Sequence, residues 1–184
     1  MLTAKVVTAD MELDQIAALS EANLVTRVSP ETKAQEGFVT WVYTPQVLKE
    51  LHAIAPSVVV KDGDILAGYA LTLTPACASV YPTMAPTLAH LSSIQYDGRP
   101  LSDRKVYLMG QICVAAPYRG QGVVDQLYAF HRAHFSGEFD MLVTEISRAN
   151  PRSLKAHTKA GFKVIDTYPD NGSLWDVVLL DWSL

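Results

Sequence analysis

The second half of the chain alternates strand-like and helix-like segments, and this order restricts the fold more than any other feature. Two strand-like segments are each followed by a segment with apolar residues at helical spacing, and a hairpin follows. Such an order implies a mixed sheet with helices on both faces. The predicted elements are strands at 105–114 and 139–146, helices at 122–135 and 151–160, and hairpin strands at 162–168 and 174–180 around a turn at 170–173.

The first half is consistent with the same α/β class. A first strand is expected before Asp10, which is a suitable N-cap for the helix that follows. Asp62-Gly63 marks the turn of a hairpin, and the proline-containing stretch after it is expected to be an insertion with one short helix. The predicted segments are a strand at 4–9, a helix at 11–25, a loop or broken helix at 29–44, a helix at 45–53, strands at 57–61 and 65–73, and the insertion at 74–104.

Composition narrows the class of protein. The chain has 184 residues, of which 49% are hydrophobic, and its formal charge is −4. We therefore expect one domain, 1–184, with a full core. The acidic balance argues against a nucleic-acid partner, and no apolar run is long enough to cross a membrane. Cys77 and Cys113 fit no paired or zinc pattern, so we expect free thiols and a cytoplasmic location.

Chemistry concentrates in the stretch from Gln111 to Val124, which reads QICVAAPYRGQGVV. A strand ends, a glycine-rich turn follows and a helix begins, and the amides at such a helix N-terminus bind phosphate oxygens. Gly120 and Gly122 leave room for close approach, and Arg119 adds a positive charge. Neither GxxxxGK[ST] nor GxGxxG is present. The stretch predicts a phosphate-binding turn of another kind.

The residues from Arg119 to Val124 read RGQGVV, follow a predicted strand and fit the pattern [RQ]xxGx[GA] except at its last position. They resemble the acetyl-CoA pyrophosphate loop of the GNAT N-acetyltransferase superfamily. A second segment, NPRSLKAHTKAGF at 150–162, is similar to another motif of that superfamily, with its Asn, small residue, aromatic and closing Gly-Phe. The two motifs lie in the expected order. The resemblance implies a GNAT-like α/β fold with a mixed sheet of six to seven strands and helices on both faces.

The resemblance also implies a set of coenzyme contacts. The backbone of Cys113 and Val114 is expected to pair with the pantetheine arm, and Asn150, assisted by Ser153, to reach the pantetheine amides. The thioester would lie where two parallel strands, 105–114 and 139–146, splay apart. Val124 departs from the usual Gly or Ala. The amides expected to hold the pyrophosphate are those of Arg119, Gly120, Gln121, Gly122, Val123 and Val124.

The reaction implied is direct transfer of acetyl from acetyl-CoA to a primary amine, without a covalent enzyme intermediate. The Val114 amide is the expected oxyanion donor. Glu145 interrupts an apolar strand, and a buried carboxylate suits a general base; alternatively it only shapes the pocket. Gln111 could serve the general-base step less directly, by orienting a water molecule. His157 stands where the family often has a tyrosine acid, and the alternative is that it packs against the coenzyme or the sheet.

The sequence does not identify the acceptor amine. A cationic small molecule or a peptide terminus fits the net negative charge of the chain. Two alternatives remain, a coenzyme A-binding regulatory or interaction domain without turnover, and a transferase that uses another acyl-CoA. A homodimer is compatible with the C-terminal strand. No metal is expected, because His131 and His134 lack a third ligand and are interpreted as helix-surface residues. Candidate acceptor-pocket walls, which could equally be core, are Trp41, Tyr43, Tyr69 and Tyr81.

Overall fold

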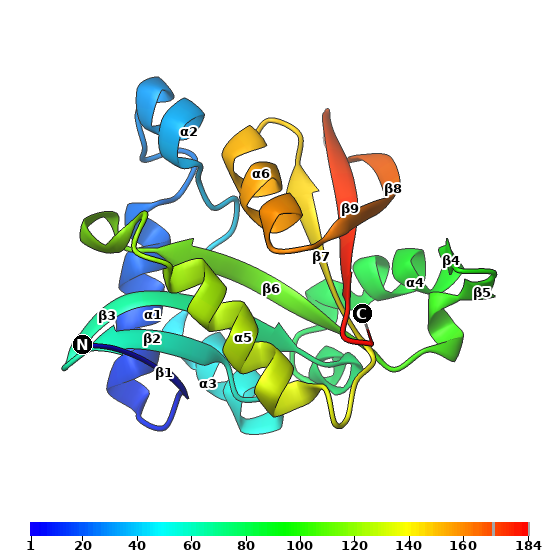
Figure 1. Cartoon of the computed structure of the whole chain (residues 1–184), viewed down its shortest axis with the longest axis horizontal. Helices are drawn as coiled ribbons and strands as arrows, with labels where there is room; N and C mark the ends of the chain where they lie inside the picture. The colour runs from blue at the N-terminus through cyan, green and yellow to red at the C-terminus, as the bar shows by residue number, and fades with distance from the viewer. Residues whose placement is uncertain (171, 184) are drawn as a thin grey trace.

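A computed structural model, which describes residues 1–170 and 172–183, contains a twisted mixed sheet as its central layer (Figure 1). Its strand order is β1-β2-β3-β6-β7-β9-β8, seven strands in the described part of the chain, and a small hairpin of β4 and β5 lies apart from it. The β6–β7 pair is parallel, and the other pairs of the sheet are antiparallel. The strands are β1 (Leu2–Val6), β2 (Val58–Asp62), β3 (Ile65–Leu73), β4 (Gln95–Tyr96), β5 (Arg99–Pro100), β6 (Val106–Val114), β7 (Met141–Ser147), β8 (Lys163–Asp170) and β9 (Ser173–Asp181).

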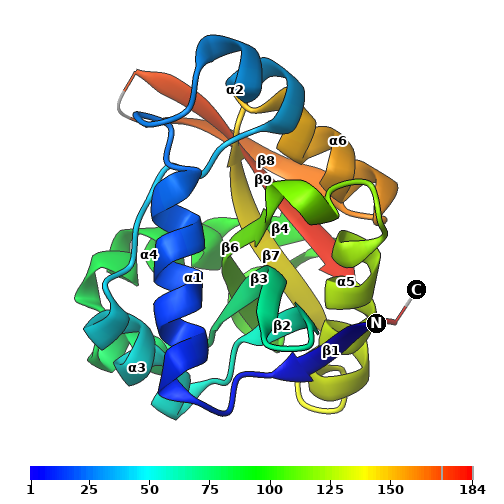
Figure 2. The ribbon, with the colours of Figure 1, turned by 90° about the vertical axis from the view of Figure 1, so that its left-hand side faces the viewer.

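Helices cover both faces of the sheet, as the order of elements predicts (Figure 2). The core accordingly has two parts. On one face, Ile16, Leu48 and Leu91 pack against strand residues; on the other, Leu127 and Phe162 do so. The first face carries α1 (Asp10–Ala22), α3 (Pro45–Ile54) and α4 (Ala85–Ser93), the second α5 (Val123–Phe135) and α6 (Pro151–Lys159), and α2 (Pro30–Glu36) lies beyond the end of the sheet near α6.

The predicted elements are present, with shifted ends. The first strand begins and ends earlier than 4–9, because Thr8 and Ala9 belong to the N-terminal cap of α1. The stretch 29–44, predicted as a loop or broken helix, holds the short helix α2 followed by irregular chain. The insertion at 74–104 holds short 3₁₀ turns and the β4–β5 hairpin besides the single expected helix. Within the predicted turn at 170–173, Asn171 lies outside the described residues.

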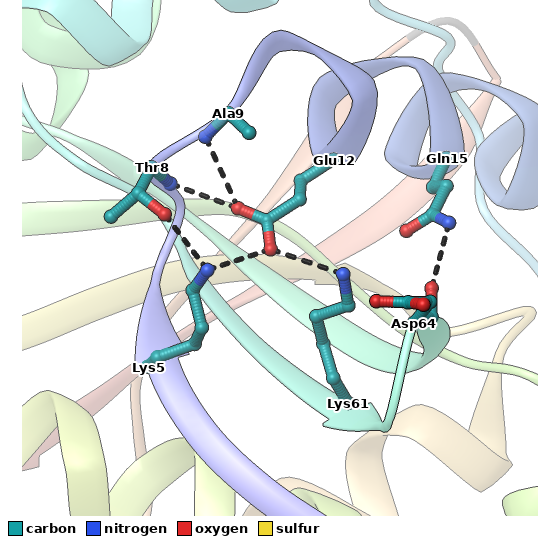
Figure 3. Close-up of polar contacts among 7 residues, drawn as sticks. All are labelled: Lys5, Thr8, Ala9, Glu12, Gln15, Lys61 and Asp64. Carbon is teal, nitrogen blue, oxygen red and sulfur yellow. Dashed lines mark hydrogen bonds and ion pairs between the residues drawn. The ribbon is translucent and has the colours of Figure 1, made fainter.

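The prediction that Asp10 caps α1 is wrong, because Glu12 performs this role from inside the helix (Figure 3). The Glu12 carboxylate accepts hydrogen bonds from the amides of Thr8, at 2.9 Å, and Ala9, at 3.3 Å. The same buried carboxylate faces the ammonium groups of Lys5, at 2.7 Å, and Lys61, at 3.2 Å. One side chain therefore joins the start of α1 to β1 and β2.

The surface assignment of His131 is also wrong. Its side chain is fully buried, and its Nδ1 lies 3.2 Å from the Tyr107 hydroxyl. His131 belongs to the helical face that carries Tyr128 and Phe135, and that face of α5 packs on the sheet. Burial lowers the pKa of His131 to about 4, so the ring is neutral at neutral pH. His134 is exposed, as expected.

Three further predictions can be compared with the described residues. Cys77 and Cys113 are both free thiols, as expected. Among residues 1–170 and 172–183, no helix has the length and hydrophobicity needed to cross a membrane. In the same residues, no group of three or more His, Cys, Asp and Glu side chains gathers as a metal site would require.

Candidate functional site

The parallel strands β6 and β7 separate halfway along their length. They pair only at Val106–Met141, Tyr107–Leu142 and Leu108–Val143. The Thr144 hydroxyl then bonds to the Met109 carbonyl at 2.9 Å, and a register shift between β3 and β6 marks a bulge at the same level. The expected splay between the two strands is confirmed, and the C-terminal half of β6 has a free edge.

The direction of the β6 backbone decides which residues face that free edge. The Ala115 amide bonds to the Ala67 carbonyl of β3 at 2.9 Å. Since N–H and C=O groups alternate in direction along a strand, Cys113 also directs its backbone toward β3, whereas Ile112 and Val114 direct theirs toward the gap. The expectation for the Val114 backbone agrees with this geometry. That for Cys113 does not, and Ile112 takes its place.

The turn after β6 is open, as a phosphate-binding loop requires. A single 3₁₀ turn, Ala116–Tyr118, leads into it, and Gly120 and Gly122 both have φ of +75°. A side chain is disfavoured at such angles. Gly122 is the N-cap of α5, so the amides that follow it have no partner within the helix. Residues 120–122 are exposed, so an anion can approach the turn, where the Gln121 amide already donates to the Tyr118 carbonyl at 3.4 Å.

A cavity of about 300 Å³ joins this turn to the end of β6 whose edge is free. Its walls are the end of β6, the first turn of α5, one side of α6 and the segment 36–39. Gln121, Gln111 and Glu145 do not line it. The predicted site residues that do are Cys113, Val114, Arg119, Gly120, Gly122, Val123, Val124, Asn150, Ser153 and His157.

Arg119 faces the protein more than the open turn. Its Nη2 donates to Asn23 Oδ1 at 2.8 Å and its Nε to the Val114 carbonyl at 3.3 Å. Its Nη1 lies 3.5 Å from a carboxylate oxygen of Glu36. Arg119 lines the cavity with a guanidinium that already has protein partners, and its contact with a phosphate stays a prediction. Its side chain ties the turn to the end of α1 and to α2.

Asn150 makes two contacts that the sequence could not show together. Its Oδ1 accepts a hydrogen bond from the Ser153 amide at 3.2 Å, which confirms Asn150 as the N-cap of α6. Its Nδ2 donates to the Phe38 carbonyl at 2.8 Å. The chain passes so close here that a Cβ on Gly37 would lie 2.8 Å from Asn150 Oδ1. Glycine is therefore required at position 37.

His157 lies at the cavity but is poorly suited to donate a proton. Its side chain is buried against Tyr128 and Phe162, and its Nδ1 lies 2.8 Å from the Ser153 carbonyl. A carbonyl only accepts, so Nδ1 carries the proton and Nε2 has none in the neutral ring. Burial lowers the pKa of His157 to about 4, which keeps the ring neutral at neutral pH. These contacts favour packing, the alternative expected from the sequence.

Glu145 lies on the other face of the sheet, beyond the point where β6 and β7 separate. Its carboxylate accepts hydrogen bonds from the Tyr168 hydroxyl at 2.9 Å and from Thr87 of α4 at 3.4 Å. Burial raises the pKa of Glu145, and these two bonds oppose the rise. The His90 ring packs against that of Tyr168 in a tilted arrangement, with ring centres 4.5 Å apart. The insertion thus supplies part of the surroundings of the candidate base.

Gln111 joins three separate segments at the bulge of β6. Its Oε1 accepts from the hydroxyls of Tyr69 and Ser20, and its Nε2 donates to the Trp41 carbonyl at 2.6 Å. The side-chain oxygen of Gln111 is thus held by two hydroxyls, and its side-chain nitrogen holds the segment around Trp41 against the sheet. Tyr43 is buried beside Tyr81, with ring centres 5.5 Å apart, whereas Trp41 is half exposed. Tyr69 belongs to the core.

Several residues that line this cavity were not predicted from the sequence as site residues. Ile112 could have been found from strand direction, had the β3–β6 register been known. Glycine at 37 was visible in the sequence, but its reason, the proximity of Asn150, was not. The cations at 152, 155 and 159 lie at helical spacing within the second motif. The residues missed are Asn23, Glu36, Gly37, Phe38, Val39, Ile112, Tyr118, Asp125, Arg152, Lys155, Ala156 and Lys159.

Comparison with known proteins identifies the fold. No protein-family model matches the chain, and no curated protein sequence matches it. Solved structures do match. A GNAT-family acetyltransferase from Bacillus cereus has a TM-score of 0.62 and 12% identity, with 98% of this chain and 97% of that chain covered. The ribosomal-protein-S18-alanine N-acetyltransferase of Escherichia coli has a TM-score of 0.65 and 11% identity (coverage 100% and 96%), and a Salmonella typhimurium protein with its cofactor acetyl-CoA has 0.63 and 13% (coverage 98% and 94%). The chain has the GNAT fold.

Proposed function

We propose that the chain, as one domain over residues 1–184, transfers acetyl from acetyl-CoA to a primary amine of a small molecule or a peptide. One observation carries the proposal: the open amides after Gly120 share a cavity with the free edge of β6, beside the gap between β6 and β7. The geometry suits an anionic group on a long arm with amide groups. The bound acetyl-CoA of the Salmonella typhimurium structure agrees with this ligand class.

The position of each residue in the site indicates its proposed role. The amides around Gly122, with the N-terminus of α5, hold the diphosphate. Ile112 and Val114 offer backbone groups to the pantetheine arm along the free edge. Acetyl-CoA supplies the activated acyl group. We keep the Val114 amide as the proposed donor to the negative charge on the acyl oxygen.

Glu145 is the proposed general base, because it borders the gap on the opposite face and has a raised pKa. It takes the proton of the incoming ammonium group, and Tyr168 and Thr87 hold its carboxylate in place. Gln111 positions the Trp41 segment on the same side of the site. Cys113 is not a nucleophile in this scheme, because burial raises the pKa of its thiol to about 11.

A second candidate function is a coenzyme A-binding domain without turnover. The state of His157 favours it, because no proton for the leaving thiolate comes from that ring. A thiol-release assay with acetyl-CoA and a panel of amines and peptides separates the two. Turnover supports the transferase; saturable CoA binding with no thiol released across the panel supports the binding domain. Acyl-CoAs of increasing chain length then test the remaining alternative, another acyl donor.

A further inference from the structure

The α6 wall of the cavity carries three cations that have no partner of opposite charge among residues 1–170 and 172–183. Arg152, Lys155 and Lys159 all line the cavity, and all three are exposed. Their spacing of three and four residues places them along one side of the helix. Within the part of the chain that the structure describes, none of them forms an ion pair.

The remaining charges of the cavity leave α6 as the place for an anion. Arg119 is already engaged with Glu36 and Asn23. On the opposite wall, Asp125 in the first turn of α5 adds a negative charge close to the open amides. A polyanionic ligand whose diphosphate is held at the N-terminus of α5 therefore has its other anionic group attracted toward α6 and repelled by Asp125.

Coenzyme A carries two separate anionic groups, which matches this arrangement. Its diphosphate suits the neutral amides of the turn. Its ribose phosphate is a monoester with a charge of about −1.5 to −2 at neutral pH, and such a group prefers ammonium or guanidinium partners. Arg152 lies in the first turn of α6, near Gly37. Lys159 follows it by about 10 Å along the helix axis, so the cations cannot all serve one phosphate.

We propose that Lys155 and Lys159 bind the ribose phosphate monoester, so that the site prefers coenzyme A over its 3′-dephospho form. The proposal rests on the proposed function, since it assumes that the cavity binds an acyl-CoA. It makes α6 a determinant of coenzyme specificity, separate from the turn that holds the diphosphate.

The test is calorimetric titration of the full chain with coenzyme A and with 3′-dephospho-coenzyme A. The wild type is expected to bind coenzyme A about tenfold or more tightly than the dephospho form. The double variant Lys155→Ala, Lys159→Ala is expected to lose this preference while its affinity for the dephospho form stays unchanged. The charge-preserving pair Lys155→Arg, Lys159→Arg should keep the preference. Lys163→Ala, an exposed lysine that does not line this cavity, is the control.

Two results would overturn the proposal while leaving the proposed function intact: equal affinity of the wild type for both ligands, or an equal loss for both ligands in the alanine pair. The second would show a general charge effect or a damaged helix, which thermal unfolding of the variant would reveal. Absence of binding of either ligand to the wild type would instead refute the proposed function, and the inference with it.

Discussion

The side-chain amide of Asn150 donates a hydrogen bond to the carbonyl of Phe38 at 2.8 Å, across 112 positions of the chain. One end of Asn150 caps α6, and the other holds the segment that follows α2 over the cavity. The connection from α1 to α3, which includes this segment, is anchored at its start by Arg119, through Asn23. Arg119 and Asn150, one from each sequence motif, thus hold the α1–α3 connection, so the cavity has a wall that neither motif encodes.

Replacing Asn150 by Ser should separate these two roles. Serine can still cap α6, but its side chain is too short to reach Phe38. We expect the Val39 amide, which bonds to the Asn23 carbonyl at 3.0 Å, to exchange with solvent faster in Asn150→Ser, while global stability changes little. Asn150→Ala should lose the cap as well, at a cost of about 1 kcal/mol. Hydrogen exchange without coenzyme measures the effect, and unchanged protection of Val39 would argue against the link.

Replacing Gly122 by Asp tests the phosphate-binding turn. The substitution places a carboxylate at the open amides, near Asp125, in a backbone conformation with φ of +75°. We expect coenzyme A affinity to fall by at least about 100-fold, because the added charge repels the diphosphate. Gly63→Asp is the matched control: Gly63 also has positive φ and open surroundings, but lies in the β2–β3 turn. Full affinity in a folded Gly122→Asp variant would refute this location of the diphosphate.

Replacing Glu145 by Gln tests the general base. We expect kcat at neutral pH to fall by about 10²-fold or more, with little change in coenzyme A affinity, because Glu145 does not line the coenzyme cavity. In the wild type, kcat should rise with pH as Glu145 loses its proton, and this limb should lie above the usual carboxylate range, since burial raises the pKa. A wild-type pH profile retained in the Gln variant would exclude Glu145 as base.

Removing the Tyr168 hydroxyl should shift that same limb. The hydrogen bond from Tyr168 stabilises the carboxylate form of Glu145, so Tyr168→Phe should raise the pKa of Glu145 further. The low-pH limb of kcat then moves to higher pH, while the plateau is largely kept. Tyr96→Phe, which removes a hydroxyl with no bond to Glu145, should leave the profile in place. A shift of the limb to lower pH would contradict this assignment.

Replacing His157 by Phe tests the packing role of the ring. Phenylalanine keeps an aromatic ring against Tyr128 and Phe162 and removes the nitrogen atoms. We expect kcat to change by no more than about threefold, whereas loss of a general acid costs about 10²–10⁴-fold. In NMR titrations, the ring signals of His157 should stay those of a neutral imidazole down to about pH 5, given a pKa of about 4. A large loss of kcat in a folded variant would restore His157 as the acid.

Glu12 should make the protein sensitive to acid. Burial opposes ionisation, but the bonds from Lys5, the Thr8 amide and Lys61 outweigh it and lower the pKa of Glu12 from 4.5 to about 2. The stabilisation is therefore complete above the unfolded pKa and is lost as the pH falls from about 4.5 to about 2. Glu12→Gln should reduce the free energy of unfolding at neutral pH by on the order of 3 kcal/mol.

The control for Glu12 is Asp10→Asn, which removes an exposed ion pair with Lys49 from the same helix end. A surface pair of this kind contributes little to stability, because water and salt screen it. Denaturant unfolding as a function of pH compares the two variants. Equal stabilities of Glu12→Gln and Asp10→Asn at neutral pH would show that the buried carboxylate has no special role.

Most helices and strands could be predicted from local sequence patterns, because helix caps and turn residues act over a few neighbouring positions. The α6 boundaries follow from Asn150, Pro151 and the glycine after the helix, which act within one or two turns of the backbone. The β2–β3 hairpin follows from Asp62-Gly63 in the same way. The start of α1 could not be assigned so directly, because the capping group, Glu12, lies inside the helix and is held by lysines from two strands.

The sequence by itself determined the glycine-rich turn after β6 and the N-cap of α6, since φ angles at glycine and side-chain caps depend on neighbouring residues. Only the tertiary structure decided what the side chains at these positions contact. Arg119 turns toward Asn23, which is 96 positions away, Asn150 toward Phe38, and His157 into the core. The β3–β6 register likewise selected Ile112 over Cys113 for the open edge. Such partners are set by how distant segments pack, which no local pattern records.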